Sequence, residues 1–288
     1  MLKGLFALML SAAIALEAYV IEEISPHQKF LKPIEMTEHN SGVPLIDCIY
    51  VINLDKRTDR WDRMTAIFKK TGIKANRVSA IDGRKFTKSQ KQQMCGPYPI
   101  HLSGPEIGCL LSHLSIVNDA YMRGFNAIWI MEDDVEVLED PSIIPSFIEN
   151  LTRIDKNWDL LYTDTNCKNS QGAPIHFGSN GWVPRPGQTP PPFKVQAIRT
   201  PVGSDLERLG LRYGMTSVIL SRSGIEKIYN YFLHIYLWRP IDVDIHYIPD
   251  MRKYGTTRDV ITNVADGLGS DIGFAWTQNL GNLLNSKH

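Results

Sequence analysis

The chain has 288 residues and carries 31 basic and 31 acidic side chains, so it has no net formal charge. This balance gives no support to nucleic-acid binding or to another polyanion-binding role. A hydrophobic content of 43% with 22% charged residues excludes wholesale disorder, and the length suits one large α/β domain or two small ones.

The N-terminal segment differs from the rest of the chain. Lys3 precedes an apolar stretch over residues 5–16, after which small residues follow. This stretch is short for a membrane span but suits the apolar region of a signal peptide. We expect a signal peptide or weak anchor at 1–18, a linker at 19–44 and a single domain at 45–288, with an ordinary N-terminal helix as the alternative. The protein would then be exported or membrane-associated; otherwise it would act at the cytoplasmic face of the membrane.

The first strand and helix of the domain follow this segment. Residues 46–54 are β-branched and aromatic, which indicates a strand, and apolar side chains then recur on one helical face until Gly72. Asn53, Arg57 and Arg60 lie near the junction, where a helix N-terminus could hold a phosphate or a nucleotide. The alternative is that both arginines pair with neighbouring aspartates on an exposed face.

A second strand and a long helix come next. The strand is predicted at 77–81 and ends in an Asp-Gly turn at Asp82. Ser103 and Gly124 have the residue types that begin and end a helix. His113 lies at the border of the apolar face of this helix, where we expect a hydrogen-bonded core histidine rather than a ligand.

Residues 127–135 hold the strongest functional signal. Five apolar residues run into Glu132, Asp133 and Asp134, as expected for a buried strand whose carboxyl end carries ligands. Three adjacent anions repel one another, and their oxygen atoms suit Mg²⁺ or Mn²⁺, ions that often accompany a diphosphate. The alternative is a solvated acidic turn.

The C-terminal half offers further acids. Asp164 ends a predicted strand, and a long Pro-rich loop follows it. In 239–247, Asp242, Asp244 and His246 alternate with apolar residues. If this segment is extended, the three polar side chains face one way and could serve a metal ion or a proton transfer. An exposed edge strand is the alternative.

The four cysteines show no metal-binding spacing. They have neither a C-x-x-C pair nor a nearby pair of histidines, so we expect no zinc site. Their even number permits disulfides without requiring them. The residues are Cys48, Cys95, Cys109 and Cys167.

Four stretches, in this order, resemble glycosyltransferase family 25, which includes lipooligosaccharide and procollagen galactosyltransferases. They are residues 50–61, 106–113, 130–135 and 239–244, and the resemblance covers roughly residues 46–250. It implies a GT-A fold, which is a Rossmann-like α/β domain with a mostly parallel central sheet. It also implies a nucleotide-sugar donor and a divalent metal ion.

The resemblance also assigns roles to residues. The residues implied near the donor nucleotide are Asn53, Arg57, Arg60, Ala80, Asp82, Glu132 and Asp133. The metal ligands implied are Asp134 and Glu132, with His246 as a residue that could complete the shell. The candidates for the general base are Asp244 and Asp242, with Asp164 behind them.

The implied activity is an inverting, metal-dependent transfer of a hexose from a UDP-sugar. We expect galactose as the sugar and a saccharide, lipooligosaccharide or glycoprotein as the acceptor, with lipopolysaccharide biosynthesis as one setting. Two alternatives stay open. One is a non-catalytic relative that binds a glycan or a partner protein, and the other is a metal-dependent nucleotidyltransferase or phosphoesterase.

Overall fold

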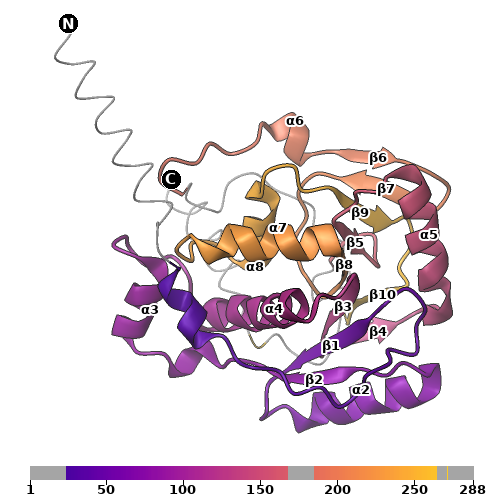
Figure 1. Ribbon diagram of the computed structural model, residues 1–288, viewed down its shortest axis with the longest axis horizontal. Helices are drawn as coiled ribbons and strands as arrows, with labels where there is room; N and C mark the ends of the chain where they lie inside the picture. Colours follow the sequence, from indigo (N-terminus) through magenta and orange to yellow (C-terminus); the bar gives the residue numbers. More distant parts are fainter. Residues whose placement is uncertain (1–23, 168–184, 265–270, 272–288) are drawn as a thin grey trace, which may run out of the picture.

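The computed structural model describes residues 24–167, 185–264 and 271, so the signal or anchor expected at 1–18 lies outside the described residues. The centre is an eight-stranded sheet with helices packed against it (Figure 1). The expected α/β class is confirmed. Among the described residues, no helix combines the length and the apolar character needed to cross a membrane.

The sheet is mixed. In spatial order its strands are β2 (Asn76–Ser79), β1 (Cys48–Asn53), β3 (Ala127–Glu132), β8 (Ser217–Ser221), β5 (Leu160–Tyr162), β9 (Lys253–Thr256), β7 (Leu206–Leu209) and β6 (Arg199–Pro201). β1 pairs in parallel with both β2 and β3, and β5 pairs in parallel with β9. β8 runs antiparallel to β3 and β5, and β7 runs antiparallel to β9 and β6. We expected parallel pairing over most of the sheet. It is limited to two groups of strands, β2–β1–β3 and β5–β9.

Seven α-helices are assigned within the described residues. They are α2 (Thr58–Thr71), α3 (Lys88–Cys95), α4 (Gly104–Arg123), α5 (Ile144–Ile154), α6 (Phe193–Gln196), α7 (Arg222–Leu233) and α8 (Ile241–Asp244). Short 3₁₀ turns are η1 (Pro26–Phe30), η2 (Gly83–Lys85), η3 (Pro141–Ile143) and η4 (Ile245–Tyr247). β4 (Val135–Val137) and β10 (Ile261–Asn263) form a separate two-stranded sheet.

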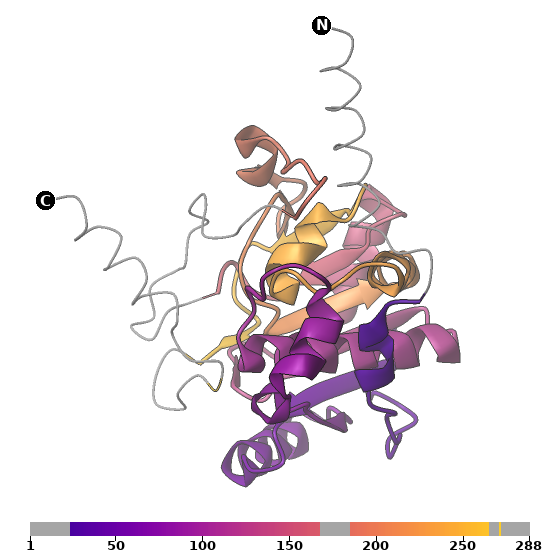
Figure 2. The same ribbon diagram turned by 90° about the vertical axis from the view of Figure 1, so that its left-hand side faces the viewer.

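Two apolar cores lie on the two faces of the sheet. On one face, Tyr50 and Ile130 pack with the apolar sides of α4 and α7, which run side by side in Figures 1 and 2. On the other face, Val51 and Trp129 pack with α2 and α5. Because β1 and β3 are buried on both faces, their sequences read as continuous apolar runs rather than as alternating ones.

Helix α4 has the ends that the sequence predicts. The Ser103 side chain accepts a hydrogen bond from the Glu106 amide while the Glu106 side chain accepts one from the Ser103 amide, and Gly124 ends the helix in the left-handed conformation. Near its start the helix approaches the turn after β2 very closely. A Cβ at Gly108 would collide with the carbonyl oxygen of Ile81. The glycine therefore allows α4 to lie directly against this turn.

The segment expected to be a linker packs against the domain over its described part. The amide of Ser25 donates to Leu233 O at 2.9 Å, and that of Lys32 donates to Ser115 Oγ at 3.0 Å. His27 is fully buried, and Ile34 belongs to the core under α4. Residues 24–44 therefore form part of the domain.

The expectation for residues 239–247 is wrong in its geometry. The segment is α8 followed by η4, not an extended strand. It begins after Pro240, and Val243, Asp244, Ile245 and His246 are all buried. Both polar and apolar residues of this segment are buried. The alternation of polar and apolar residues therefore does not correspond to one exposed and one buried face. Asp242, Asp244 and His246 consequently reach different partners.

Candidate functional site

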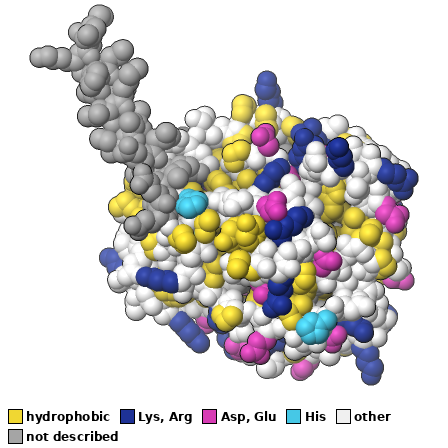
Figure 3. Space-filling model, in the orientation of Figure 1, with side chains coloured by type: hydrophobic (Ala, Val, Ile, Leu, Met, Phe, Trp, Pro, Cys, Tyr) yellow, Lys and Arg dark blue, Asp and Glu magenta, His cyan; other side chains and the backbone are white. Residues whose placement is uncertain are grey.

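The candidate site lies at the carboxyl ends of three neighbouring strands. β1 sits in parallel between β2 and β3, with Asn53 opposite Ser79 and Ile52 opposite Glu132. The ends of these strands therefore meet at one edge of the sheet, where open α/β sheets bind ligands. Figure 3 shows basic and acidic side chains interspersed over one face of the molecule. This distribution agrees with the zero net charge and with a local site rather than a charged surface.

Asp133 is held entirely by the protein. Asn53 Nδ2 donates to its Oδ2 at 2.6 Å, and Arg60 Nη1 donates to its Oδ1 at 2.5 Å. Arg60 and Asp133 are both buried, and burial raises the pKa of Asp133 despite its two partners. Asn53, Arg60 and Asp133 thus form one buried network, and both oxygens of Asp133 are used within it.

Asp134 is held less completely. Its Oδ2 lies 3.3 Å from Arg60 Nη1, while its Oδ1 is buried and makes no hydrogen bond within the described residues. Burial, together with the nearby Glu132 carboxylate, raises the pKa of Asp134 to about 7. A buried carboxylate oxygen without a donor is costly, and a bound cation would remove that cost. Asp134 therefore fits the metal-ligand role that the sequence predicts for it.

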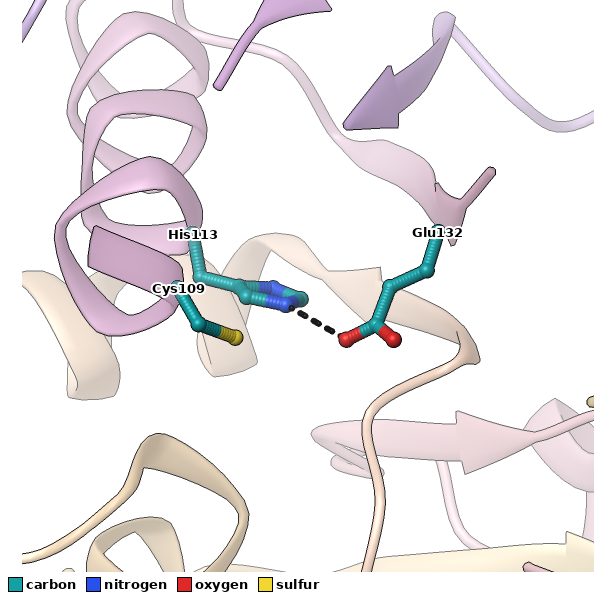
Figure 4. Close-up of side chains that lie close together, drawn as sticks. All are labelled: Cys109, His113 and Glu132. Carbon is teal, nitrogen blue, oxygen red and sulfur yellow. Dashed lines mark hydrogen bonds and ion pairs between the residues drawn. The ribbon is translucent and has the colours of Figure 1, made fainter. Parts of the chain in front are cut away.

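Glu132 faces a helix rather than the arginines. Its Oε1 lies 3.4 Å from Nε2 of His113, which is completely buried on α4, and Cys109 lies one turn earlier on the same helix (Figure 4). Each of the three offers a ligand atom, and these atoms all lie within 4.8 Å of one another. Cys109 and His113 were not among the predicted site residues, although their spacing of four on a predicted helix was a usable signal.

Arg57 occupies the junction before α2, as predicted, but with acidic partners. Its Nη1 lies 2.6 Å from Asp271 Oδ2, and its Nε and Nη2 each lie 3.0 Å from Asp59. Asp271 also lies 3.6 Å from Lys56 Nζ and 3.9 Å from Arg60 Nη1. Arg57 thus pairs with a neighbouring aspartate, as in the alternative that we considered for both arginines. Arg60 instead points into the buried network.

Ala80 and Asp82 lie at the same edge of the sheet. The amide of Ala80 donates to Asn53 O at 2.9 Å, which ties the end of β2 to the end of β1. The Asp82 side chain accepts from the amide of Arg84 and pairs with its guanidinium at 2.9 Å, and the Arg84 hydrogen bonds lower the pKa of Asp82. Ala80 is therefore next to Asn53, whereas the contacts of Asp82 are with Arg84; their place in a donor site stays a prediction.

The three candidate bases have different surroundings. Asp244 is fully buried and pairs with Arg185 and with Arg239, the latter at 3.3 Å. Asp164 is buried and pairs with Arg212 at 2.8 Å.

Asp242 instead accepts one hydrogen bond from the Gly214 amide at 2.8 Å, and no arginine pair is found for it in the described part of the chain. Burial raises the pKa of Asp242 to about 6, and the Glu132 carboxylate adds to this effect. Among the three, Asp242 is the carboxylate without a cationic partner and therefore the one best suited to accept a proton.

His246 is engaged by the backbone. Its Nε2 lies 2.8 Å from the carbonyl oxygen of Arg212, to which it donates. Burial lowers the pKa of His246 well below its ordinary value. Within the described residues, His246 does not join the group formed by Cys109, His113 and Glu132. Its assignment to a metal shell stays a prediction.

Comparison with known proteins gives matches over the part of the chain that contains β1, β2 and β3, whose carboxyl ends form the candidate site. The sequence model of glycosyltransferase family 25, described as an LPS biosynthesis protein, matches residues 46–172. Procollagen galactosyltransferase 2 of Homo sapiens is 30% identical over 146 residues, which are 45% of this chain and 23% of the relative.

Two other relatives extend this picture. A glycosyltransferase 25 family member of Drosophila melanogaster is 26% identical over 183 residues, 56% of this chain and 29% of the relative. The inactive glycosyltransferase 25 family member 3 of Mus musculus is 31% identical over 126 residues, 40% of this chain and 21% of the relative.

The chain thus spans only about a quarter of the length of these relatives. The matched residues nevertheless include β1, α2, α4 and β3, which position Asn53, Arg60 and the three consecutive acids. Residues 46–172 are thus similar to glycosyltransferase family 25, over somewhat less than half of the chain.

Proposed function

We propose that the chain is an inverting, metal-dependent glycosyltransferase of the GT-A type, which moves a hexose from a UDP-sugar to a saccharide or glycoconjugate acceptor. Galactose is the proposed sugar because relatives carry the name procollagen galactosyltransferase. Since the chain spans about a quarter of those relatives, the proposal depends on the chemistry of the site at least as much as on the names.

The observation that carries the metal dependence is the buried Oδ1 of Asp134, for which the described residues supply no donor. The charges agree with it. When all three consecutive acids are ionised, they bring three negative charges and Arg60 brings one positive charge, so two negative charges remain, which match a divalent cation. Oxygen ligands select Mn²⁺ or Mg²⁺. A cation held by Asp134 and Glu132 would stabilise the charge that builds on UDP as it leaves.

The donor would lie along the ends of β1 and β2. Arg57 stands at the N-terminus of α2, where the helix dipole and a guanidinium both favour a diphosphate. The Asp271 carboxylate now pairs with this arginine. A diphosphate entering the site would replace that carboxylate with an anion of higher charge. Ala80 and Asp82 are the residues proposed to contact the ribose and base of the nucleotide.

Asp242 is the proposed general base. In an inverting transfer, the acceptor hydroxyl attacks the anomeric carbon from the face opposite UDP, and a carboxylate takes its proton. Asp242 has a raised pKa and lies within electrostatic reach of Glu132, whereas Asp244 and Asp164 already neutralise buried arginines. A carboxylate whose pKa lies near the working pH is suited to this task.

The test is UDP release by the full chain from a panel of UDP-sugars, with saccharide acceptors present, with and without Mn²⁺. Metal-dependent turnover of one donor is the expected result. Asp134→Ala should abolish it and keep the wild-type unfolding midpoint within a few degrees. Asp62→Ala, which removes an exposed carboxylate from α2, is the matched control and should keep full activity.

Two outcomes would contradict the proposal. Retained turnover in Asp134→Ala would overturn the metal assignment. No turnover together with no stabilisation by UDP and Mn²⁺ would favour a non-catalytic relative, since a ligand at 100 times its Kd stabilises a protein by about 2.7 kcal/mol. The relatives named inactive make this second outcome worth measuring. Nucleotidyl transfer or phosphate release in place of UDP would favour the other alternative class.

A further inference from the structure

Cys109, His113 and Glu132 converge on one point from two rigid elements. Cys109 and His113 are four residues apart on α4, so their side chains lie on the same face of the helix, one turn apart. Glu132 ends β3 and faces them, as Figure 4 shows. The Cys109 sulfur, a ring nitrogen of His113 and a Glu132 oxygen all lie within 4.8 Å of one another. No part of the proposed donor chemistry uses the cysteine or the histidine.

The distance between the histidine and the glutamate fits two ligands of one ion. His113 Nε2 and Glu132 Oε1 are 3.4 Å apart, which is long for a hydrogen bond between these groups. Two ligands of a tetrahedral zinc ion, each about 2.0–2.1 Å from the metal, are about 3.3 Å apart. The spacing is therefore close to that of a bound ion without any movement of either residue.

Within the described residues, the histidine ring makes its polar contact through one nitrogen only. It is completely buried, and its Nδ1 makes no hydrogen bond within the described residues. A buried polar group without a partner costs about 1–3 kcal/mol. The other nitrogen, Nε2, carries the polar interaction of the ring and faces Glu132 (Figure 4).

The helix that carries two of the residues is held firmly. Ser103 and Glu106 cap its start, and Gly108, next to Cys109, packs against the backbone of Ile81 and Gly83. Glu132 lies in register between β1 and β8, since its amide donates to Thr216 O at 2.8 Å. The three candidate ligands therefore sit on two firmly held elements.

We propose that Cys109, His113 and Glu132 bind a thiophilic divalent cation, with Zn²⁺ as the preferred ion. A thiolate, an imidazole and one carboxylate select zinc over Mn²⁺ or Mg²⁺, which prefer oxygen ligands. Binding converts the Cys109 thiol into a thiolate and releases its proton to solvent. Three protein ligands leave a fourth position for water or another small ligand, as in zinc sites that are not closed.

This site shares Glu132 with the candidate donor site. An ion bound by Cys109 and His113 would engage the Glu132 carboxylate and leave Asp134 with one fewer partner for Mn²⁺. Zinc is therefore expected to weaken Mn²⁺ binding at Asp134. The inference itself does not depend on sugar transfer, because metal binding can be measured without a nucleotide or a sugar.

The test uses Co²⁺ as a spectroscopic probe on the full chain after removal of metals by a chelator. Tetrahedral cobalt bound to a thiolate gives a near-ultraviolet charge-transfer band and visible bands. We expect both in the wild-type protein, at one ion per chain, and we expect Zn²⁺ to remove them by displacement. Cys109→Ser should lose the charge-transfer band, and His113→Gln should bind Co²⁺ at least about 100-fold more weakly, since even residues behind a metal ligand contribute up to that factor.

The matched control is Cys95→Ser, which removes another buried thiol from the neighbouring helix α3 and should keep the wild-type spectrum. If Cys109→Ser does not fold, Glu132→Gln replaces it, because that side chain is partly exposed at the end of β3 and should likewise weaken binding. A wild-type protein without the bands, or bands that persist in Cys109→Ser, would overturn the proposal. Loss of Mn²⁺-dependent sugar transfer in Asp134→Ala with the cobalt bands intact would separate this site from the donor site.

Discussion

Replacing Asp134 with asparagine should stabilise the protein. The change keeps the size of the side chain and removes a carboxylate that is buried beside Glu132. Arg60, which loses one of its acidic neighbours, keeps its closer partner Asp133 at 2.5 Å. The variant therefore gives up a charge that the fold holds at a cost, without leaving a buried arginine unpaired.

The size of the effect follows from the pKa of Asp134, which burial raises from 3.8 to about 7. At about 1.4 kcal/mol for each tenfold change in proton affinity, this difference corresponds to an upper limit of about 4 kcal/mol at pH 7. The asparagine amide needs a hydrogen-bond partner of its own, which costs part of the gain. We expect the free energy of unfolding to rise by about 1–3 kcal/mol.

The dependence on pH identifies the cause. Below pH 4 the carboxyl of Asp134 is protonated in both the folded and the unfolded chain, so the variant should have little advantage. Between pH 4 and 7 the unfolded chain releases this proton and the folded chain retains it. The wild-type protein therefore loses stability relative to Asp134→Asn as the pH rises through this range, and the difference becomes constant above about pH 8.

The assay is urea unfolding of both proteins at several pH values, with and without Mn²⁺. Mn²⁺ should stabilise the wild-type protein and have no effect on Asp134→Asn. Asp62→Asn, on the exposed side of α2, is the control and should show no gain that depends on pH. A destabilised Asp134→Asn variant, or a gain that is the same at pH 4 and pH 7, would refute the reasoning.

Three further predictions concern other groups. Asp242→Asn should lower kcat by about 10²–10⁴ without loss of stability. Asp244→Asn, which removes the carboxylate that pairs with two buried arginines, should cost about 3–5 kcal/mol of stability, and equal stability of the two variants would count against this distinction. Burial lowers the pKa of His27 to about 3. Protonation of this histidine in the unfolded chain should therefore remove about 2 kcal/mol of stability as the pH falls from 7 to 5. His27→Gln should reduce this dependence of stability on pH, and an unchanged dependence would argue against the burial effect. Gly108→Ala should cost about 1–3 kcal/mol in urea unfolding because its methyl group meets the Ile81 carbonyl, and wild-type stability would show that the turn can move aside.

The edge of the sheet that carries the acids could be predicted because local sequence determined it. A continuous apolar run predicts the doubly buried β3, and the three acids that follow must then lie at its carboxyl end. The start and end of α4 were also predictable, since Ser103, Glu106 and Gly124 act on backbone groups within a few residues of themselves.

The remaining features depend on contacts between distant segments. Residues 239–247 alternate like a strand, yet they form short helical turns because Arg185 and the backbone at Gly214 and Arg212 satisfy their polar groups one by one. The different surroundings of Arg57 and Arg60 also depend on a distant segment. Their spacing allowed both to be exposed, and only the position of Asp133 at the end of β3 drew Arg60 inward.

The antiparallel strand β8 has a consequence for how the chain folds. β3 ends at Glu132, but its second neighbour begins at Ser217, and β5 pairs with the same strand. A fragment limited to residues 46–172 would leave edges of both apolar strands without hydrogen-bond partners, and such edges promote aggregation. During synthesis, the central part of the sheet cannot close until residue 221 has left the ribosome. Pairing between segments so far apart in sequence slows folding, and a chaperone that shields β3 meanwhile should raise the yield.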